Sequence, residues 1–152
     1  MTTPIVMLLL MAGPALLARA AAAAAGRPAD IRRAAAFGLG LMFVFTGLGH
    51  FVETETMALM VPAWVPARVP MIYATGVLEF AIALGFFVRP TTRLAGWAAA
   101  GLLIVFFPVN VYAAINRVPM GGHAWGPVYL LVRAPVQLAI LLWTYWFTIR
   151  RE

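Results

Sequence analysis

Glu79 is the residue of this sequence whose position points most strongly to chemistry. It is the ninth residue of the apolar segment 71–88, and its neighbours on one helix face are the small residues Thr75, Gly76 and Ala83. A rise of about 1.5 Å per helical residue puts its carboxyl roughly 13 Å along the segment. An isolated charge at that depth is costly, so the carboxyl must be neutral, paired or in contact with water. Glu79 is therefore a candidate proton carrier or ligand anchor.

Other apolar segments contribute polar residues as well. Arg133 and Gln137 lie four residues apart, which puts them on one face of the last segment. Helical counting places His50, Tyr73 and Asn110, each from a different segment, at about the depth of Arg133. Gln137 lies near the depth of Glu79. Four helices thus contribute to one zone, and we predict a ligand-binding site or polar network of His50, Tyr73, Glu79, Asn110, Arg133 and Gln137.

These six residues admit two interpretations. In the first, they form an internal hydrogen-bond network that fixes helix packing. Glu79 then pairs with Arg133, directly or through one water, while Asn110 and Gln137 bond backbone carbonyls that nearby prolines leave free. In the second, they line an outward-facing pocket for a small ligand or a proton, with Glu79 as anchor, Arg133 as its partner or an anion clamp, and His50 at the mouth. Some of them could instead face a partner subunit.

The composition indicates that these residues belong to a membrane protein. The chain is 64% hydrophobic and only 11% charged, whereas soluble domains average about 25% charged residues. The net charge of +6 comes from arginines at the ends of apolar runs, which does not favour nucleic-acid binding. There is no cysteine, which excludes disulfides, thiol relays and iron–sulfur clusters. With only His50 and His123, the latter read as a solvated loop residue, we predict no metal site.

Five apolar segments are long enough, or nearly so, to cross about 30 Å of hydrocarbon. The connections between them are short, so residues 1–152 should form one all-α transmembrane domain. The first segment could instead be a signal peptide, but residues 1–4 carry no lysine or arginine, which favours an uncleaved helix. The predicted spans are residues 5–25, 34–52, 71–88, 94–115 and 128–149.

The arginines also predict an orientation. If the N-terminus is outside, seven arginines in loops or at segment ends face the cytoplasm and two face outward. The outward pair is Arg68 and Arg117, and the others are Arg27, Arg32, Arg33, Arg89, Arg93, Arg150 and Arg151. This bias predicts five spans with the N-terminus out and the C-terminus in.

The outer loop 53–70 should lie on the membrane interface. Thr54 is placed to cap a short helix that must end near Pro62, and the apolar residues that follow include Trp64, a typical interfacial anchor. The loop could be a plug that closes the helix bundle or a lid over a substrate.

Several runs of this sequence resemble the DoxX-like family of bacterial membrane proteins. They are TGLGHF (46–51), MVPAWVP (60–66), YATGVLEFAIALGFFVRPTTRLAGW (73–97), FPVNVYAA (107–114) and RAPVQLAILLWTYW (133–146). The resemblance covers about residues 34–148 in the family's order, and it marks His50, Glu79, Pro108, Asn110, Arg133, Pro135 and Gln137 as motif positions. It implies a four-helix transmembrane bundle, here preceded by one extra helix, in the bacterial cytoplasmic (inner) membrane. Related proteins are linked to quinone-dependent sulfur oxidation and to membrane oxidoreductase complexes, although this chain lacks cysteines for thiol chemistry of its own.

These observations favour an accessory membrane subunit that is not catalytic on its own and binds a quinone or another small apolar ligand for a redox partner. A small transporter or proton-coupled carrier using Glu79 is an alternative, although the chain has no internal repeat of the transporter kind. A purely structural subunit of a larger membrane complex is a third. The expected partners are the lipid bilayer and a membrane protein or a second copy of this chain.

Overall fold

The computed structural model describes residues 2–150, which contain helices and no strand. Five helical segments are long and apolar enough to cross a membrane, as predicted. They are α1 (Thr2–Ala25), α2 (Ile31–Val52), α4 (Arg68–Phe87), α5 (Thr92–Ile115) and a last segment of η2 (His123–Tyr129), α6 (Leu130–Thr144) and η3 (Tyr145–Ile149). The short elements α3 (Thr54–Leu59) and η1 (Arg89–Thr91) lie in connections.

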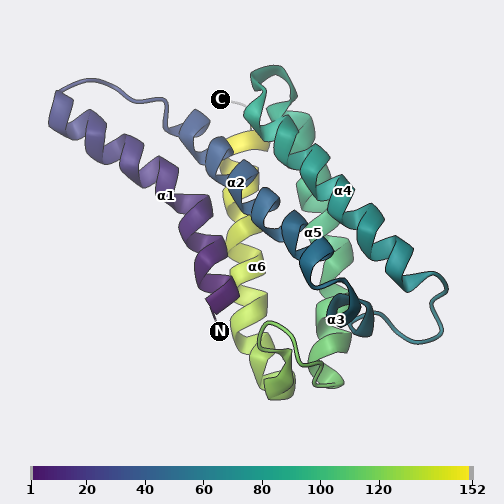
Figure 1. The fold of residues 1–152 in the computed structure, drawn as a ribbon. Coiled ribbons are helices and arrows are strands. Elements are labelled where there is room, and N and C mark those ends of the chain that lie inside the picture. Colours follow the sequence, from purple (N-terminus) through teal and green to yellow (C-terminus); the bar gives the residue numbers. More distant parts are fainter. Residues whose placement is uncertain (1, 151–152) are drawn as a thin grey trace.

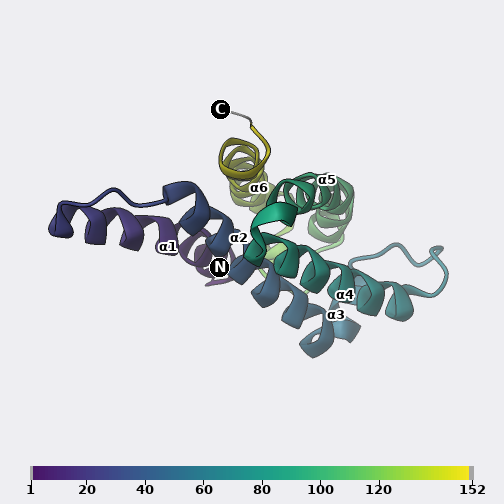
Figure 2. The same ribbon diagram turned by 90° about the horizontal axis from the view of Figure 1, so that it is seen from above.

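The helices pack in two layers. In Figure 2, α1, α2 and α4 lie side by side, and α5 and α6 cover one side of this row. The most extensive contacts join α2 to α4 and to α1, so α2 is the central helix of the row (Figure 1). All five long segments contribute to one core, in which Leu39, Phe43, Phe86 and Ile140 are almost completely buried. The polar residues of the candidate site are thus brought together by α2, α4, α5 and α6.

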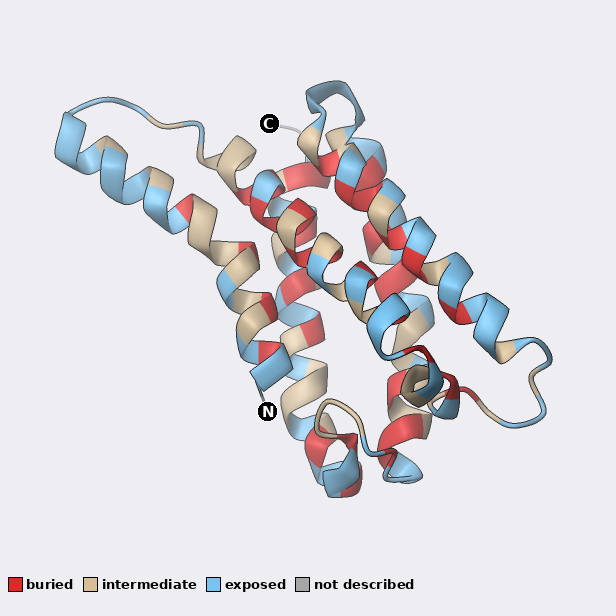
Figure 3. Cartoon of the chain, viewed as in Figure 1, coloured by how far each residue is buried: buried red, intermediate tan, exposed pale blue. Residues whose placement is uncertain are grey.

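The outer surface of the helices is apolar. Leu17, Leu94 and Leu131 each expose more than 70% of their surface, and many other large hydrophobic side chains are exposed along the helices. In Figure 3 the buried positions follow the inner faces of the helices, and the exposed ones lie on the outside. Water would not stabilise so much exposed apolar surface, whereas lipid acyl chains match it. The structure therefore has the surface of a multi-pass membrane protein.

The predicted short helix in the outer loop is present as α3, but Thr54 does not cap it. Glu53 occupies the N-cap position and makes no side-chain cap bond. The Thr54 hydroxyl instead donates to the carbonyl of His50, at 2.7 Å, and so ties the start of α3 back to the end of α2. Val61 is buried against Ile72 of α4, whereas Trp64 is 83% exposed. The loop thus packs on α4 through Val61 and leaves Trp64 at the surface, and its interfacial location stays a prediction.

Candidate functional site

Glu79 of α4 is buried and faces His50 of α2. The His50 Nε2 atom lies 3.5 Å from Glu79 Oε1, and both side chains are almost fully enclosed. The other carboxyl oxygen, Glu79 Oε2, is buried and has no hydrogen-bond partner among residues 2–150. The sequence-based prediction named both residues, but it gave Glu79 a different partner.

Two glycines permit this close approach of α2 and α4. A Cβ atom on Gly76 would lie 2.7 Å from His50 Cβ, and one on Gly47 would lie 2.9 Å from the ring of Phe80. Such distances are shorter than real Cβ contacts, so a larger residue at Gly76 must push His50, and with it α2, away. The small face noted around Glu79 in the sequence is therefore filled by α2.

The surroundings of His50 determine which ring nitrogen carries a proton. His50 Nδ1 lies 3.0 Å from the Ile72 carbonyl oxygen, which can only accept, so Nδ1 is protonated. The Thr75 hydroxyl also lies 3.0 Å from Nδ1. A hydrogen bond between Nε2 and Glu79 then requires a proton either on Nε2 or on the carboxyl. Such a bond would place one proton between the two side chains.

A second polar cluster surrounds Asn110 of α5. Asn110 Oδ1 accepts from Arg133 Nε at 3.1 Å and lies 3.2 Å from His123 Nε2. Its Nδ2 donates to the Phe106 carbonyl, which fixes the orientation of the amide. Arg133 Nη1 also points at the sulfur of Met7, 3.8 Å away, so α1 closes one side of this cluster.

The expectation that His123 is a solvated loop residue is wrong. His123 begins η2, exposes only 4% of its surface and packs edge-on against the ring of Tyr129. Its Nδ1 lies 2.7 Å from the Met120 carbonyl, while Nε2 faces Asn110. The glycines around His123 suggested a solvated loop, but they allow η2 to fold back so that its first residue reaches the interior.

The predicted direct pair between Glu79 and Arg133 is not formed. Glu79 pairs with His50, while Arg133 donates to Asn110. A link between Glu79 and Arg133 through one water stays a prediction. Helical counting gives the depths of Glu79 and Arg133 but not how α4 and α6 are rotated about their own axes. The rotation of α4 turns Glu79 toward α2.

Phe106 lies between the two clusters. Its ring centroid is 6.0 Å from that of His50, and its carbonyl accepts from Asn110. Gln137 is also buried, and its Nε2 donates to the Leu103 carbonyl at 2.7 Å, whereas its Oε1 has no partner in the described part of the chain. Gln137 and Asn110 thus donate to backbone carbonyls of α5 near Pro108. Neither donates to the Ile104 carbonyl, which is the one that Pro108 leaves without its helical hydrogen bond.

Tyr73 lies apart from both clusters. It is 43% exposed, and its ring packs against that of Phe51. It lines a surface cavity of about 420 Å³ beside α3, which Glu53 and Glu55 also line. A second cavity, of about 370 Å³, lies at the opposite end of the helices. Neither is lined by Glu79 or Arg133. Four of the six predicted site residues thus lie in two packed polar clusters, and Tyr73 and Gln137 lie outside them.

Sequence reasoning missed three contributors to these clusters, namely Met7, Phe106 and His123. Met7 and Phe106 look like ordinary apolar residues of a membrane helix, and no pattern in the sequence singles them out. Among residues 2–150, no three histidine or acidic side chains come close enough together to bind a metal ion.

Five membrane-length apolar helices around buried polar clusters define a multi-pass membrane protein. The model of the family described as a domain of unknown function, DUF8561, matches residues 39–148, and the chain belongs to this family. The matched part begins within α2, so it includes His50, Glu79, Asn110 and Arg133 and excludes α1. No curated protein and no solved structure matches the chain.

Proposed function

We propose that this chain is an accessory subunit of a membrane oxidoreductase system. In this proposal it is not catalytic on its own and binds a quinone or another small apolar ligand for a redox partner. The observation that carries the proposal concerns the two carboxyl oxygens of Glu79: one faces His50, and the other is buried without a partner in the part of the chain that the structure describes. A buried polar atom without a partner costs free energy, so its presence calls for a functional explanation.

The His50–Glu79 pair suits the chemistry of quinones. Reduction of a quinone takes up two electrons and two protons. The electrons would come from the redox partner, one proton from the pair and the other from water. A carboxylate oxygen accepts from a hydroquinone hydroxyl, whereas a protonated carboxyl donates to a quinone carbonyl. Glu79 Oε2 thus offers a bond in either redox state once the helices admit the ligand. The resemblance to DoxX-like proteins supports the same class of ligand.

The test uses decylubiquinone as the probe and the melting temperature of the purified protein in detergent as the readout. A ligand that binds only the folded state raises Tm, by about 5 °C at a concentration far above its dissociation constant. We expect this increase for the unsubstituted protein and its loss in Glu79→Gln. Glu55→Gln, which neutralises an exposed carboxyl in α3, should keep the full increase.

The increase should depend on Glu79 specifically. An equal rise in Tm for Glu79→Gln and Glu55→Gln, or no rise in any protein, would refute the proposed ligand site. Proton uptake into liposomes that contain the protein, without any response to quinone, would instead favour a proton-coupled carrier.

We further propose that α2, α4, α5 and α6 form the family's bundle and that α1 is an added helix. The proposed location is the bacterial cytoplasmic membrane, with the N-terminus outside and the C-terminus in the cytoplasm. The family match supports the division because it begins after α1. The arginines support the orientation, because Arg32, Arg33, Arg89 and Arg93 gather around one cavity at a single end of the helices.

A reporter active only in the cytoplasm, fused after Glu152, should be active in bacterial cells. A reporter active only outside the cytoplasm should be silent at the same position and active when fused before Thr2. The opposite pattern would reverse the orientation.

A further inference from the structure

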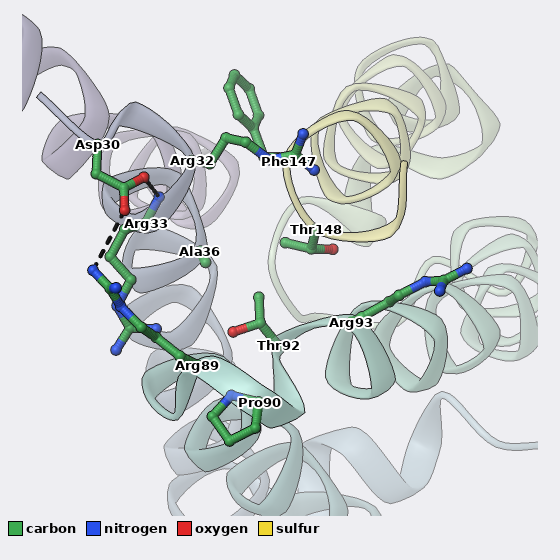
Figure 4. A pocket seen from close by; sticks show the side chains of 10 residues that line it. All are labelled: Asp30, Arg32, Arg33, Ala36, Arg89, Pro90, Thr92, Arg93, Phe147 and Thr148. Atoms are coloured by element: carbon green, nitrogen blue, oxygen red, sulfur yellow. Dashed lines mark hydrogen bonds and ion pairs between the residues drawn. The ribbon is translucent and has the colours of Figure 1, made fainter. Parts of the chain in front are cut away.

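An arginine-lined cavity of about 370 Å³ opens where α2 and α5 begin and η3 ends (Figure 4). Its walls carry Arg32, Arg33, Arg89 and Arg93 and a single acidic residue, Asp30. Thr92 of α5 and Thr148 of η3 also line it (Figure 4). None of these residues belongs to the His50–Glu79 pair or to the Asn110 cluster.

The positive charges of this cavity exceed what its aspartate can neutralise. One Asp30 oxygen accepts from the backbone N–H of Arg33 at the start of α2, and the other lies 3.4 Å from Arg89 Nη2. The Arg33 guanidinium donates to the carbonyls of Phe86 and Phe87, which are uncharged acceptors. Even with Arg32 left out of the count, Arg33, Arg89 and Arg93 line the cavity with a single aspartate, and this excess of positive charge favours a bound anion.

Two further features supplement these charges. The α2 and α5 helices both start at the cavity, and helix N-termini carry partial positive charge. Arg33 covers the last carbonyls of α4, which removes a source of negative potential.

Aromatic residues place the cavity at the level of lipid headgroups. Trp146 in η3 and Trp97 in α5 are both 57% exposed near this end of the helices. The Arg150 guanidinium lies 4.2 Å from the centre of the Trp146 ring. Exposed tryptophan and arginine mark the boundary between hydrocarbon and headgroups in membrane proteins. In a bilayer crossed by the five helices, the lipid phosphate groups would therefore lie at the depth of the arginines.

We propose that this cavity binds the phosphate of an anionic phospholipid headgroup. Guanidinium groups bind phosphate with two parallel hydrogen bonds, and basic pockets between transmembrane helices bind anionic headgroups. The exposed Leu94 and Trp97, in the first turns of α5, provide apolar surface for the acyl chains of the same lipid.

The experiment is native mass spectrometry of the purified protein released from micelles that contain phosphatidylglycerol. The unsubstituted protein should retain this lipid in preference to phosphatidylcholine, which has a phosphate but no net charge. Arg89→Gln and Arg93→Gln should each weaken retention about fivefold, the effect of removing one basic residue near an anionic lipid surface. Arg93 makes no side-chain hydrogen bond or ion pair with residues 2–150, so its variant should fold normally.

Arg117→Gln is the matched control, because it removes the same charge at the opposite end of the helices. It should retain phosphatidylglycerol as the unsubstituted protein does. Equal retention by all variants, or a loss as large in Arg117→Gln, would overturn the proposal in favour of a general attraction between opposite charges. Displacement of the lipid by millimolar inorganic phosphate would assign the cavity to a free anion instead.

Discussion

Leucine in place of Asn110 is expected to lower the free energy of unfolding in detergent by about 2–3 kcal/mol. Asn110 Oδ1 is the acceptor for Arg133 Nε and also faces His123 Nε2. Its removal leaves a charged guanidinium without this partner among apolar helices. Hydrogen bonds to charged groups contribute about 1.5–3 kcal/mol each, more than neutral ones. Unfolding by sodium dodecyl sulfate, followed by tryptophan fluorescence, measures the change.

Asn116→Leu, at the C-cap of the same helix, provides a matched control. Both asparagines donate from Nδ2 to the carbonyl four residues earlier, but Asn116 is exposed. Its replacement should change the free energy of unfolding by less than about 0.5 kcal/mol. Equal losses for the two variants would mean that the contacts of Asn110 with Arg133 and His123 do not stabilise the fold.

Arg133→Met should be tolerated better than Asn110→Leu. This replacement removes the buried charge together with its need for an acceptor, and Asn110 Oδ1 still faces His123. Replacing a buried charged group by an apolar one of similar size is often close to neutral. The order of the two losses therefore tests whether Asn110 serves mainly to accept from Arg133.

Alanine at Gly76 is expected to separate α2 from α4 and to cost about 1–3 kcal/mol through overpacking. The added methyl group would lie 2.7 Å from His50 Cβ and 2.8 Å from the Phe51 ring. A Cβ atom is fixed to its helix, so rotation of the His50 side chain cannot relieve the first contact. The same shift should displace His50 from Glu79 and weaken any effect of decylubiquinone on Tm.

Gly101→Ala is the control for this variant. Among residues 2–150, a Cβ on Gly101 of α5 would have no atom outside its own helix within 4 Å. Alanine is favoured over glycine inside a helix by about 1 kcal/mol, and both variants gain this preference equally. The difference between them isolates the contact of α2 with α4. Equal stability of the two variants would show that α2 and α4 do not pack closely at Gly76.

The number and type of the membrane-length helices follow from the sequence alone. Apolar runs of about 20 residues must be helical in lipid, because only a helix satisfies the backbone polar groups within one segment. The five predicted segments accordingly correspond to α1, α2, α4, α5 and the segment around α6. The short helix in the outer loop was also predicted, since Pro62 limits how far it can run.

The partners of the polar side chains could not be derived in the same way. Helical counting gives depth along a segment, but the contact between two residues also depends on how each helix is rotated and which helix lies beside it. Glu79 and Arg133 have compatible depths, yet α4 turns Glu79 toward α2, where Gly47 and Gly76 permit close packing. Residue type and depth thus marked Glu79 as unusual, and tertiary structure assigned it to His50.

His123 illustrates the remaining difference between sequence and structure. Its neighbours Gly121, Gly122 and Gly126 indicate a loop, and glycine-rich loops are usually solvated. All three glycines adopt positive φ angles, which turn the chain back into η2 and bury His123 against Asn110. The sequence alone therefore determined that the chain has five apolar helices and which of their residues are unusually polar for a membrane span. Only the tertiary structure decided which of these residues meet, because side-chain contacts depend on helix rotation and chain reversal, which hydropathy does not encode.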